Sequence, residues 1–138
     1  MKGNGGSLLK KAAQNREAGE WAEQRGFYDV AASRYYYALF QKALWFLRQL
    51  PGFKEPAGEG SSHVKLIQAF SQEVYAQLKD EEILWIAQFH ALRKCRRTAD
   101  YGHMMLTELE FKQGFKYKYD RVAAVVERVI GGDSNEKR

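Results

Sequence analysis

The chain has 138 residues, of which 45% are hydrophobic and 14% aromatic, so it holds enough apolar material for one domain with its own core. The single Cys95 excludes an internal disulfide, and the longest apolar run near the centre, residues 35–40, is far shorter than the roughly 20 residues of a membrane-spanning helix. The formal charge of +5 favours an anionic partner such as nucleic acid, and we expect a cytoplasmic protein without a membrane partner.

The first half of the chain predicts two long helices. The first begins at Ser7, a favourable N-cap residue, and extends to about Gln24, where Gly26 ends it. The second extends from Tyr28 to Leu50 and is apolar on most of its faces. A helix of this kind is surrounded by other elements, so it should be central and the most buried.

A long loop follows, over residues 51–62, and it holds both prolines of the chain. A third helix is predicted to begin at Ser61 or Ser62. A fourth is predicted from about residue 80 to 98.

A fifth helix opens at Thr107, because Glu110 three residues later can complete a capping box with it. It is predicted to end at Gly131, and residues 1–6 and 131–138 read as loose ends. No stretch alternates like a strand between turn signals, so the sequence predicts one all-α domain over residues 1–138.

Common enzyme signatures are missing from the sequence. There is no GxGxxG and no GxxxxGK[ST], and the glycines of GNGGS near the N-terminus follow no predicted strand. The histidines His63, His90 and His103 lack the paired spacing of zinc ligands, with Cys95 alone beside them. We therefore expect neither a metal nor another cofactor.

The segment RKCRRTADYGH, residues 93–103, joins a basic helix end to a histidine. Its four cations are candidate nucleic-acid-binding residues: Arg93, Lys94, Arg96 and Arg97. Cations are also favoured near helix C-termini by the helix dipole, so the cluster has a purely structural interpretation as well.

Three segments carry a resemblance to a known family. Residues 26–44, GFYDVAASRYYYALFQKAL, match a small turn followed by A-x-x-R-x-Y-Y-A-x-F. Residues 61–70, SSHVKLIQAF, match Ser/Thr-His-x-x-L-I, and residues 96–102, RRTADYG, match R-x-x-A-D-Y-G. In this order and spacing the three resemble the HEPN superfamily, specifically its branch of short prokaryotic proteins.

The resemblance implies an up-and-down bundle of four to five helices that forms a homodimer. Many HEPN proteins are metal-independent endoribonucleases with an Arg and a His separated by four to six residues. Arg97 and His103 have five residues between them and are the implied catalytic pair. Many members also act as toxins beside a nucleotidyltransferase antitoxin, so RNA and such an antitoxin are the implied partners.

The chemistry of RNA cleavage without a metal suits these residue types. Histidine titrates near neutrality and can transfer a proton, and a guanidinium matches the geometry of a phosphate. Two alternatives remain. The first is a non-catalytic HEPN module for a nucleotidyltransferase partner, and the second is a helical bundle that binds a nucleotide-like ligand.

Several other residues have a structural interpretation. His63, in the first turn of the third helix, is interpreted as a capping or packing residue, and His90 as a half-buried structural histidine. The run of residues 35–37, three tyrosines, is predicted to serve the core and an interface. Arg34 lies on an otherwise apolar helix, so we expect it to pair with Asp100.

Overall fold

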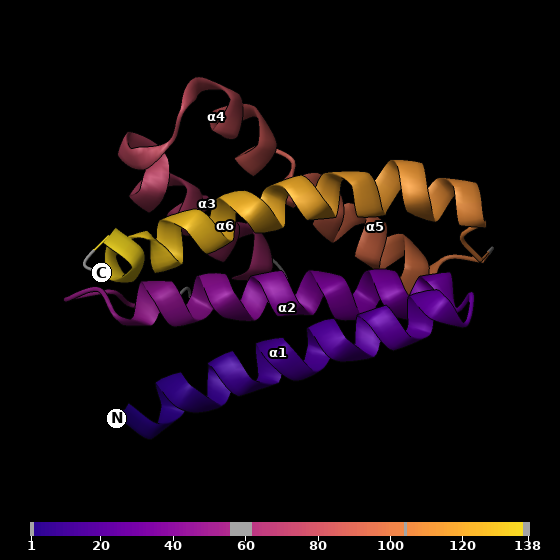
Figure 1. Ribbon diagram of the computed structural model, residues 1–138, viewed down its shortest axis with the longest axis horizontal. Helices are drawn as coiled ribbons and strands as arrows, with labels where there is room; N and C mark the ends of the chain where they lie inside the picture. The colour runs from indigo at the N-terminus through magenta and orange to yellow at the C-terminus, as the bar shows by residue number, and fades with distance from the viewer. Residues whose placement is uncertain (1, 56–61, 104, 137–138) are drawn as a thin grey trace.

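Residues 2–55, 62–103 and 105–136 are described by the computed structural model, and every regular element in these ranges is helical. This confirms the predicted all-α bundle. The helices of Figure 1 are α1 (Lys2–Gln24), α2 (Tyr28–Arg48), α3 (Ser62–Val74), α4 (Asp80–Ile86), α5 (Phe89–Tyr101) and α6 (Tyr117–Glu136). A 3₁₀ turn, Tyr75–Gln77, follows α3, and a π-helical segment, Glu110–Lys116, leads into α6.

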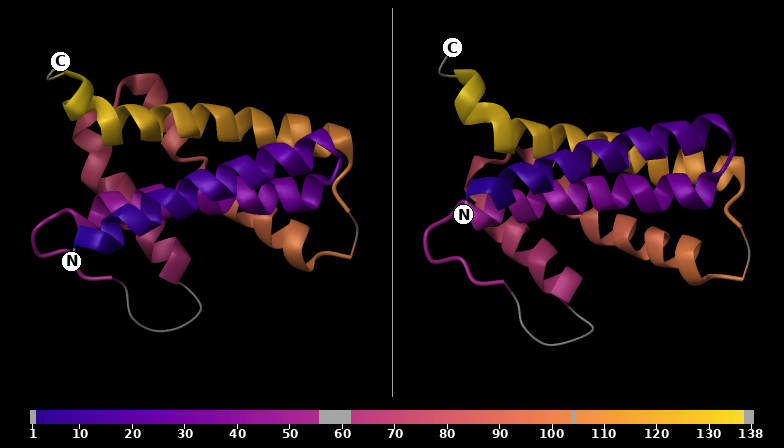
Figure 2. Two further views of the ribbon diagram at one scale, coloured as in Figure 1. Left: turned by 60° about the horizontal axis from the view of Figure 1, so that its bottom comes forward. Right: turned by 90° about the horizontal axis from the view of Figure 1, so that it is seen from below.

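The long helix α2 is the centre of the bundle. α1 folds back along it through a tight turn at Gly26, whose φ of 79° is a left-handed conformation that suits glycine. α6 covers a second side of α2, and α3 and α5 cover a third (Figure 2). The colours of Figure 1 show that α1, α2, α5 and α6 alternate in direction, which is the up-and-down arrangement.

Burial follows the sequence pattern of α2. The helix holds more buried side chains than any other helix in the described ranges: Ala31, Ala32, Ser33, Tyr35, Tyr36, Ala38, Leu39, Ala43 and Leu47. The prediction that this helix is the most buried is confirmed. In the same ranges, the structure has no helix that combines the length and the apolarity required to cross a membrane.

The predicted fourth helix is wrong as a single element, because α4 ends at Ile86 and α5 begins at Phe89. The break lets the two parts pack on different partners. On α4, Glu82 accepts hydrogen bonds from the Arg128 guanidinium of α6 at 2.6 and 2.7 Å. On α5, Phe89 is fully buried near the ring of Tyr36 in α2.

The outer ends of the chain are more helical than expected. α1 begins at Lys2 rather than at Ser7, and α6 continues through Gly131 to Glu136. The described backbone is therefore helical at residues 2–6 and 131–136, within the ends that the sequence predicts to be loose.

The capping box at the start of the last helix is present. The Thr107 backbone N–H donates to Glu110 Oε1 at 2.9 Å, and the Glu110 N–H donates to Thr107 Oγ1 at 3.1 Å. The residues that follow form the π-helical segment, which buries Phe111 and Phe115 against α2. Ser61, one of the two predicted starts of the third helix, lies outside the described residues, and α3 begins at Ser62.

The predicted pair of Arg34 and Asp100 does not form. Arg34 is exposed and donates to Asn15 Oδ1 of α1 at 3.1 Å, and Gln41, seven residues later, accepts from the same asparagine at 2.9 Å. The polar side chains Arg34 and Gln41 of α2 therefore face α1. Asp100 belongs to α5 and pairs with Arg96 at 3.2 Å.

Candidate functional site

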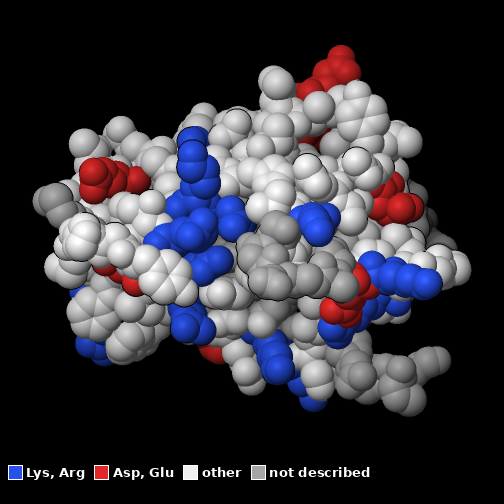
Figure 3. Space-filling view, turned by 180° about the vertical axis from the view of Figure 1, so that it is seen from behind, with Lys and Arg blue, Asp and Glu red and all other residues white. Residues whose placement is uncertain are grey.

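A basic hollow lies between the start of α3 and the second half of α5. It is open, has a volume of about 420 Å³, and is lined by His63, Arg93, Arg96, Arg97 and Tyr101. Figure 3 shows Lys and Arg side chains gathered on the side of the molecule where α3 and α5 lie. We call this site the basic hollow.

Helical spacing brings the residues of α5 together. Arg93, Arg97 and Tyr101 are spaced by four and share one face of the helix. Arg96 lies at the border between this face and the buried face, which carries Phe89 and Leu92. The side chain of Arg96 can therefore pack on α2 while it also lines the hollow.

Arg96 is held in a fixed position at the base of the hollow. It is only 7% exposed, and its guanidinium carbon lies 5.3 Å from the ring centroid of Tyr36 and 5.2 Å from that of Tyr37. Its Nη1 donates to Asp100 Oδ2 at 3.2 Å. Cation–π contacts of a desolvated guanidinium are each worth roughly 0.5–2 kcal/mol, so two aromatic rings and a carboxylate anchor this charge.

His63 enters the hollow from α3. Its Nδ1 lies 2.9 Å from the Tyr36 hydroxyl oxygen, and its ring stacks on Phe40 with centroids 4.0 Å apart. Burial and the neighbouring cations Arg96 and Arg93 lower the pKa of His63 below its ordinary value. The imidazole is therefore neutral at physiological pH.

Two arginine side chains of the hollow have an unused donor. The Nε atoms of Arg93 and Arg96 are buried and have no hydrogen-bond partner in the part of the chain that the structure describes. A buried donor without an acceptor destabilises a protein by roughly 1–3 kcal/mol.

Two of the predicted residues lie elsewhere. Lys94 is exposed on α5 but does not line the hollow. His103 is also exposed and lies just beyond the end of α5, outside the lining of the hollow. The structure thus brings Arg93, Arg96 and Arg97 together and leaves His103 at the adjoining helix end.

Gly102 determines how the chain leaves α5 before His103. Its N–H donates to the Thr98 carbonyl oxygen at 2.7 Å, and a Cβ atom on this residue would lie 2.5 Å from the same oxygen. A larger residue would have to move the backbone of the helix end. Glycine therefore permits the sharp exit that carries His103 away from the axis of α5.

The sequence interpretation missed two residues of the hollow, His63 and Tyr101. His63 does pack, as predicted, but it also lines the hollow with the arginines of α5. The only signal for it was the histidine of the Ser/Thr-His-x-x-L-I segment. Tyr101 follows Arg97 by four residues. If the predicted helix had ended at residue 101 instead of 98, Tyr101 would have been placed on the same helix face as Arg97.

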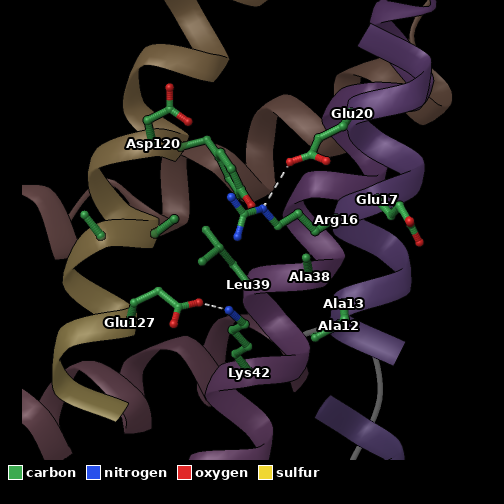
Figure 4. A pocket seen from close by; sticks show the side chains of 13 residues that line it. Ala12, Ala13, Arg16, Glu17, Glu20, Ala38, Leu39, Lys42, Asp120 and Glu127 are labelled. Atoms are coloured by element: carbon green, nitrogen blue, oxygen red, sulfur yellow. Dashed lines mark ion pairs between the residues drawn. The ribbon is translucent and has the colours of Figure 1, made fainter. Parts of the chain in front are cut away.

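A second pocket, of about 610 Å³, lies between α1, α2 and α6 (Figure 4). Alanines form much of its wall, and Arg16 and Lys42 pair there with Glu20 and Glu127. Its charged lining residues are two cations and four carboxylates: Arg16, Lys42, Glu17, Glu20, Asp120 and Glu127. This excess of negative charge is unfavourable for the phosphate of a nucleotide-like ligand.

Comparisons with known proteins give no match. No family model matches the chain, and neither a curated protein nor a solved structure matches it. Across residues 2–55, 62–103 and 105–136, no three His, Cys, Asp or Glu side chains form a group that could hold a metal ion. The geometry of the basic hollow is therefore the main basis for a functional argument.

Proposed function

We propose that this chain is a HEPN-like domain that binds RNA through the basic hollow and cleaves it without a metal ion. The observation that supports the proposal is the convergence of three guanidinium groups, those of Arg93, Arg96 and Arg97, on one open concave site. Guanidinium groups bind phosphate through paired hydrogen bonds.

The balance of charge around the hollow favours a polyanion. Among the described residues, no carboxylate lines it, and Asp100 beside it is paired with Arg96. Tyr101 stands at the rim with 74% of its surface exposed, where it offers a face on which an unpaired base can stack. Phosphate contacts supply most of the affinity of such sites, and base contacts refine it.

In the proposed cleavage step, the ribose 2′-oxygen attacks the neighbouring phosphorus, the bond from phosphorus to the 5′-oxygen breaks, and a 2′,3′-cyclic phosphate forms. His103 takes the proton of the 2′-hydroxyl, a solvent water protonates the departing 5′-oxygen, and Arg97 stabilises the charge that develops on the phosphate. His103 is exposed at the end of the helix that carries Arg97, which leaves it accessible to a strand lying across the hollow. Both contributions are of the kinds that accelerate phosphodiester cleavage: oxyanion stabilisation and general acid–base catalysis.

The decisive experiment measures binding and cleavage of one labelled single-stranded RNA with chelator present. Wild type should bind and cleave, and Arg97→Ala should lose both to a large degree. Lys94→Ala is the matched control, because it removes a cation from the same helix but outside the hollow. Equal losses in the two variants would mean that the charge of the helix, not the hollow, attracts RNA.

The alternative function, a non-catalytic module for a protein partner, is favoured by a different surface. Large apolar side chains are exposed at the end of the bundle where α1 turns into α2 and where the segment between α5 and α6 lies beside that turn. They are Trp21, Phe27, Val30, Met105 and Leu109. A hydrogen bond from the Leu106 N–H to Asp29 Oδ1 at 2.9 Å holds the two parts together. We call this surface the apolar end. Exposed patches of this kind mark protein interfaces.

A second copy of the chain or a nucleotidyltransferase antitoxin would be the occupant of the apolar end. A stable interface there should bury roughly 1,000 Å² or more in total. RNA binding at the hollow and protein binding at the apolar end use different residues, so the two functions can be tested separately.

A further inference from the structure

We infer that His63 binds the RNA phosphate as a neutral hydrogen-bond donor, through an Nε2–H group that the Tyr36 hydroxyl fixes in place. The inference rests on the proposed RNA site and adds a specific contact from α3 to the three arginines of α5. It gives His63 a positioning role, distinct from the proton transfer proposed for His103.

The Tyr36 hydroxyl fixes which ring nitrogen carries the proton. The Tyr36 side chain is fully buried, so its O–H needs an acceptor inside the protein. Burial raises the pKa of Tyr36 above its ordinary value, so the phenol keeps its proton. In the described part of the chain its hydroxyl has one hydrogen-bond partner, His63 Nδ1 at 2.9 Å. Tyr36 therefore donates to Nδ1, and a neutral ring with an accepting Nδ1 carries its proton on Nε2.

The surroundings of His63 keep the ring neutral. From α5 it faces Arg93, Arg96, Arg97 and Tyr101 across the hollow, and from α2 it contacts Tyr36, Tyr37 and Phe40. These groups are cationic or uncharged. A second proton on the ring would have to enter at Nδ1, where it would break the hydrogen bond from Tyr36 and add charge beside the arginines.

The ring is also held in orientation. It stacks on Phe40 at an interplanar angle of 8° with centroids 4.0 Å apart. Nδ1 is occupied by Tyr36, so Nε2–H is the only polar group that the ring can offer to a ligand in the hollow. An oxyanion bound there would receive guanidinium donors from α5 and an imidazole donor from α3. Donors fixed on two helices select the position of a phosphate as well as its charge.

The test combines imidazole nitrogen NMR of the wild-type protein and of Tyr36→Phe with RNA binding by His63→Phe, by His63→Gln and by a double variant. The NMR spectrum at pH 7 should show His63 protonated on Nε2 alone, and Tyr36→Phe should remove that preference. His63→Phe keeps an aromatic ring on Phe40 without an N–H, and it should weaken binding of a labelled single-stranded RNA about tenfold or more. His63→Gln should retain most of the affinity, because its amide can accept from Tyr36 and donate into the hollow.

A matched control separates packing from binding. His63→Phe leaves the buried Tyr36 hydroxyl without an acceptor, so the double variant Tyr36→Phe with His63→Phe restores an apolar contact. The double variant should regain thermal stability relative to His63→Phe but should stay weak in RNA binding. Recovery of full affinity in the double variant would overturn the inference, since a stability defect would then explain the loss.

The remaining outcomes distinguish this inference from the proposed function. If Arg97→Ala loses RNA but His63→Phe binds like wild type, the RNA site stands and the role of His63 is wrong. If wild type binds no RNA, the proposed function fails. The contact between His63 and an anion is then tested by titrating wild type with inorganic pyrophosphate. Shifts of the His63 ring signals would support an anion contact, and unchanged signals, or a proton found on Nδ1, would overturn it. If His63→Phe does not fold, the same pyrophosphate titration of wild type tests whether His63 contacts an anion.

Discussion

The guanidinium of Arg96 lies against the ring of Tyr36, with its central carbon 5.3 Å from the ring centroid. The same tyrosine ring carries the hydroxyl that bonds His63. One buried residue of α2 thus positions a cation from α5 and an imidazole from α3. The basic hollow is therefore fixed by the core of the bundle, which reduces the entropy lost when a phosphate binds.

The first prediction concerns Arg96 and its aromatic contacts. Arg96→Lys should lower the free energy of unfolding by roughly 1–2 kcal/mol, because an ammonium cannot stack between two rings as a planar guanidinium does. Denaturant titration measures the change. Arg97→Lys is the control, since Arg97 is exposed and should change stability by less than about 0.5 kcal/mol. A stability change at Arg96 no larger than at Arg97 would contradict the anchoring role of Tyr36 and Tyr37.

The second prediction concerns the pH dependence of stability through Glu82. The hydrogen bonds from Arg128, followed by that from the Lys79 backbone N–H, lower the pKa of the Glu82 carboxyl in the folded protein. A group with a lowered folded pKa stabilises the protein above its unfolded pKa of about 4.3, and this stabilisation is lost as pH falls through the folded pKa. Wild type should therefore lose stability in acid more steeply than Glu82→Gln.

Glu82→Gln should also be less stable than wild type at pH 7, by about 1.5 kcal/mol or more, because charge-assisted hydrogen bonds are lost. Glu108→Gln provides the control, since its pair with Lys112 is exposed on both sides and should contribute little to stability. Thermal unfolding of the three proteins between about pH 3 and pH 7 measures both effects. Parallel pH profiles for wild type and Glu82→Gln would argue against the proposed linkage.

The third prediction concerns salt. The logarithm of the RNA association constant should fall linearly with the logarithm of salt concentration, because bound phosphates release counterions. Arg97→Ala should reduce the slope by roughly 0.7, the value for one phosphate contact to a single strand. Lys94→Ala should leave the slope close to that of wild type. An affinity that is insensitive to salt would exclude the basic hollow as the phosphate site.

The fourth prediction concerns the apolar end and the homodimer. Light scattering at tens of micromolar protein should give the mass of a dimer, and Leu109→Lys should shift it toward monomer. Leu109 is 63% exposed in the single chain, so the change should not unfold the protein. Leu84→Lys is the control, because Leu84 is 70% exposed on α4, away from this surface. If wild type is a monomer, the apolar end does not bind a second copy of the chain, and it would then bind a different protein or none.

The fold was predictable where a signal is local. The all-round apolarity of α2 and the capping box of Thr107 and Glu110 both depend on residues close in sequence, and both are present. The break between Ile86 and Phe89 was not predictable, because it results from packing α4 on α6 and α5 on α2. The pairing of Arg34 with Asn15 was missed for the same reason, since periodicity alone does not say which neighbour a polar stripe faces.

The site was predictable only in part. The arginines of α5 form a cluster in the sequence, and helical spacing was sufficient to group Arg93 with Arg97. His63 joins them from 30 residues earlier in the chain, so its place depends on how α3 packs beside α5. The histidine that follows the arginines in sequence, His103, is separated from the hollow by the sharp exit at Gly102.

The last prediction tests Arg97 and His103 as a catalytic pair. His103→Ala should reduce the cleavage rate by about 10²–10⁴, the range for loss of general acid–base catalysis. Arg97→Ala should reduce it by about 10²–10³ through loss of a charge-stabilising donor. The double variant should be far less impaired than the product of the two losses, because both residues would act on one transition state. Wild type, both single variants and the double variant are compared on one RNA with EDTA present and substrate at saturation, so that differences in binding do not enter.

The same assay distinguishes the two histidines. His63→Gln should cleave at nearly the wild-type rate, because a positioning donor is retained, whereas His103→Gln should be as impaired as His103→Ala, because an amide cannot transfer the proton. Circular dichroism should show folded protein for all variants, since His103 and Arg97 are both exposed. Equal cleavage by wild type and the Arg97/His103 double variant would remove the nuclease function from this site. RNA binding that persisted under those conditions would point to a module that holds RNA for a partner enzyme.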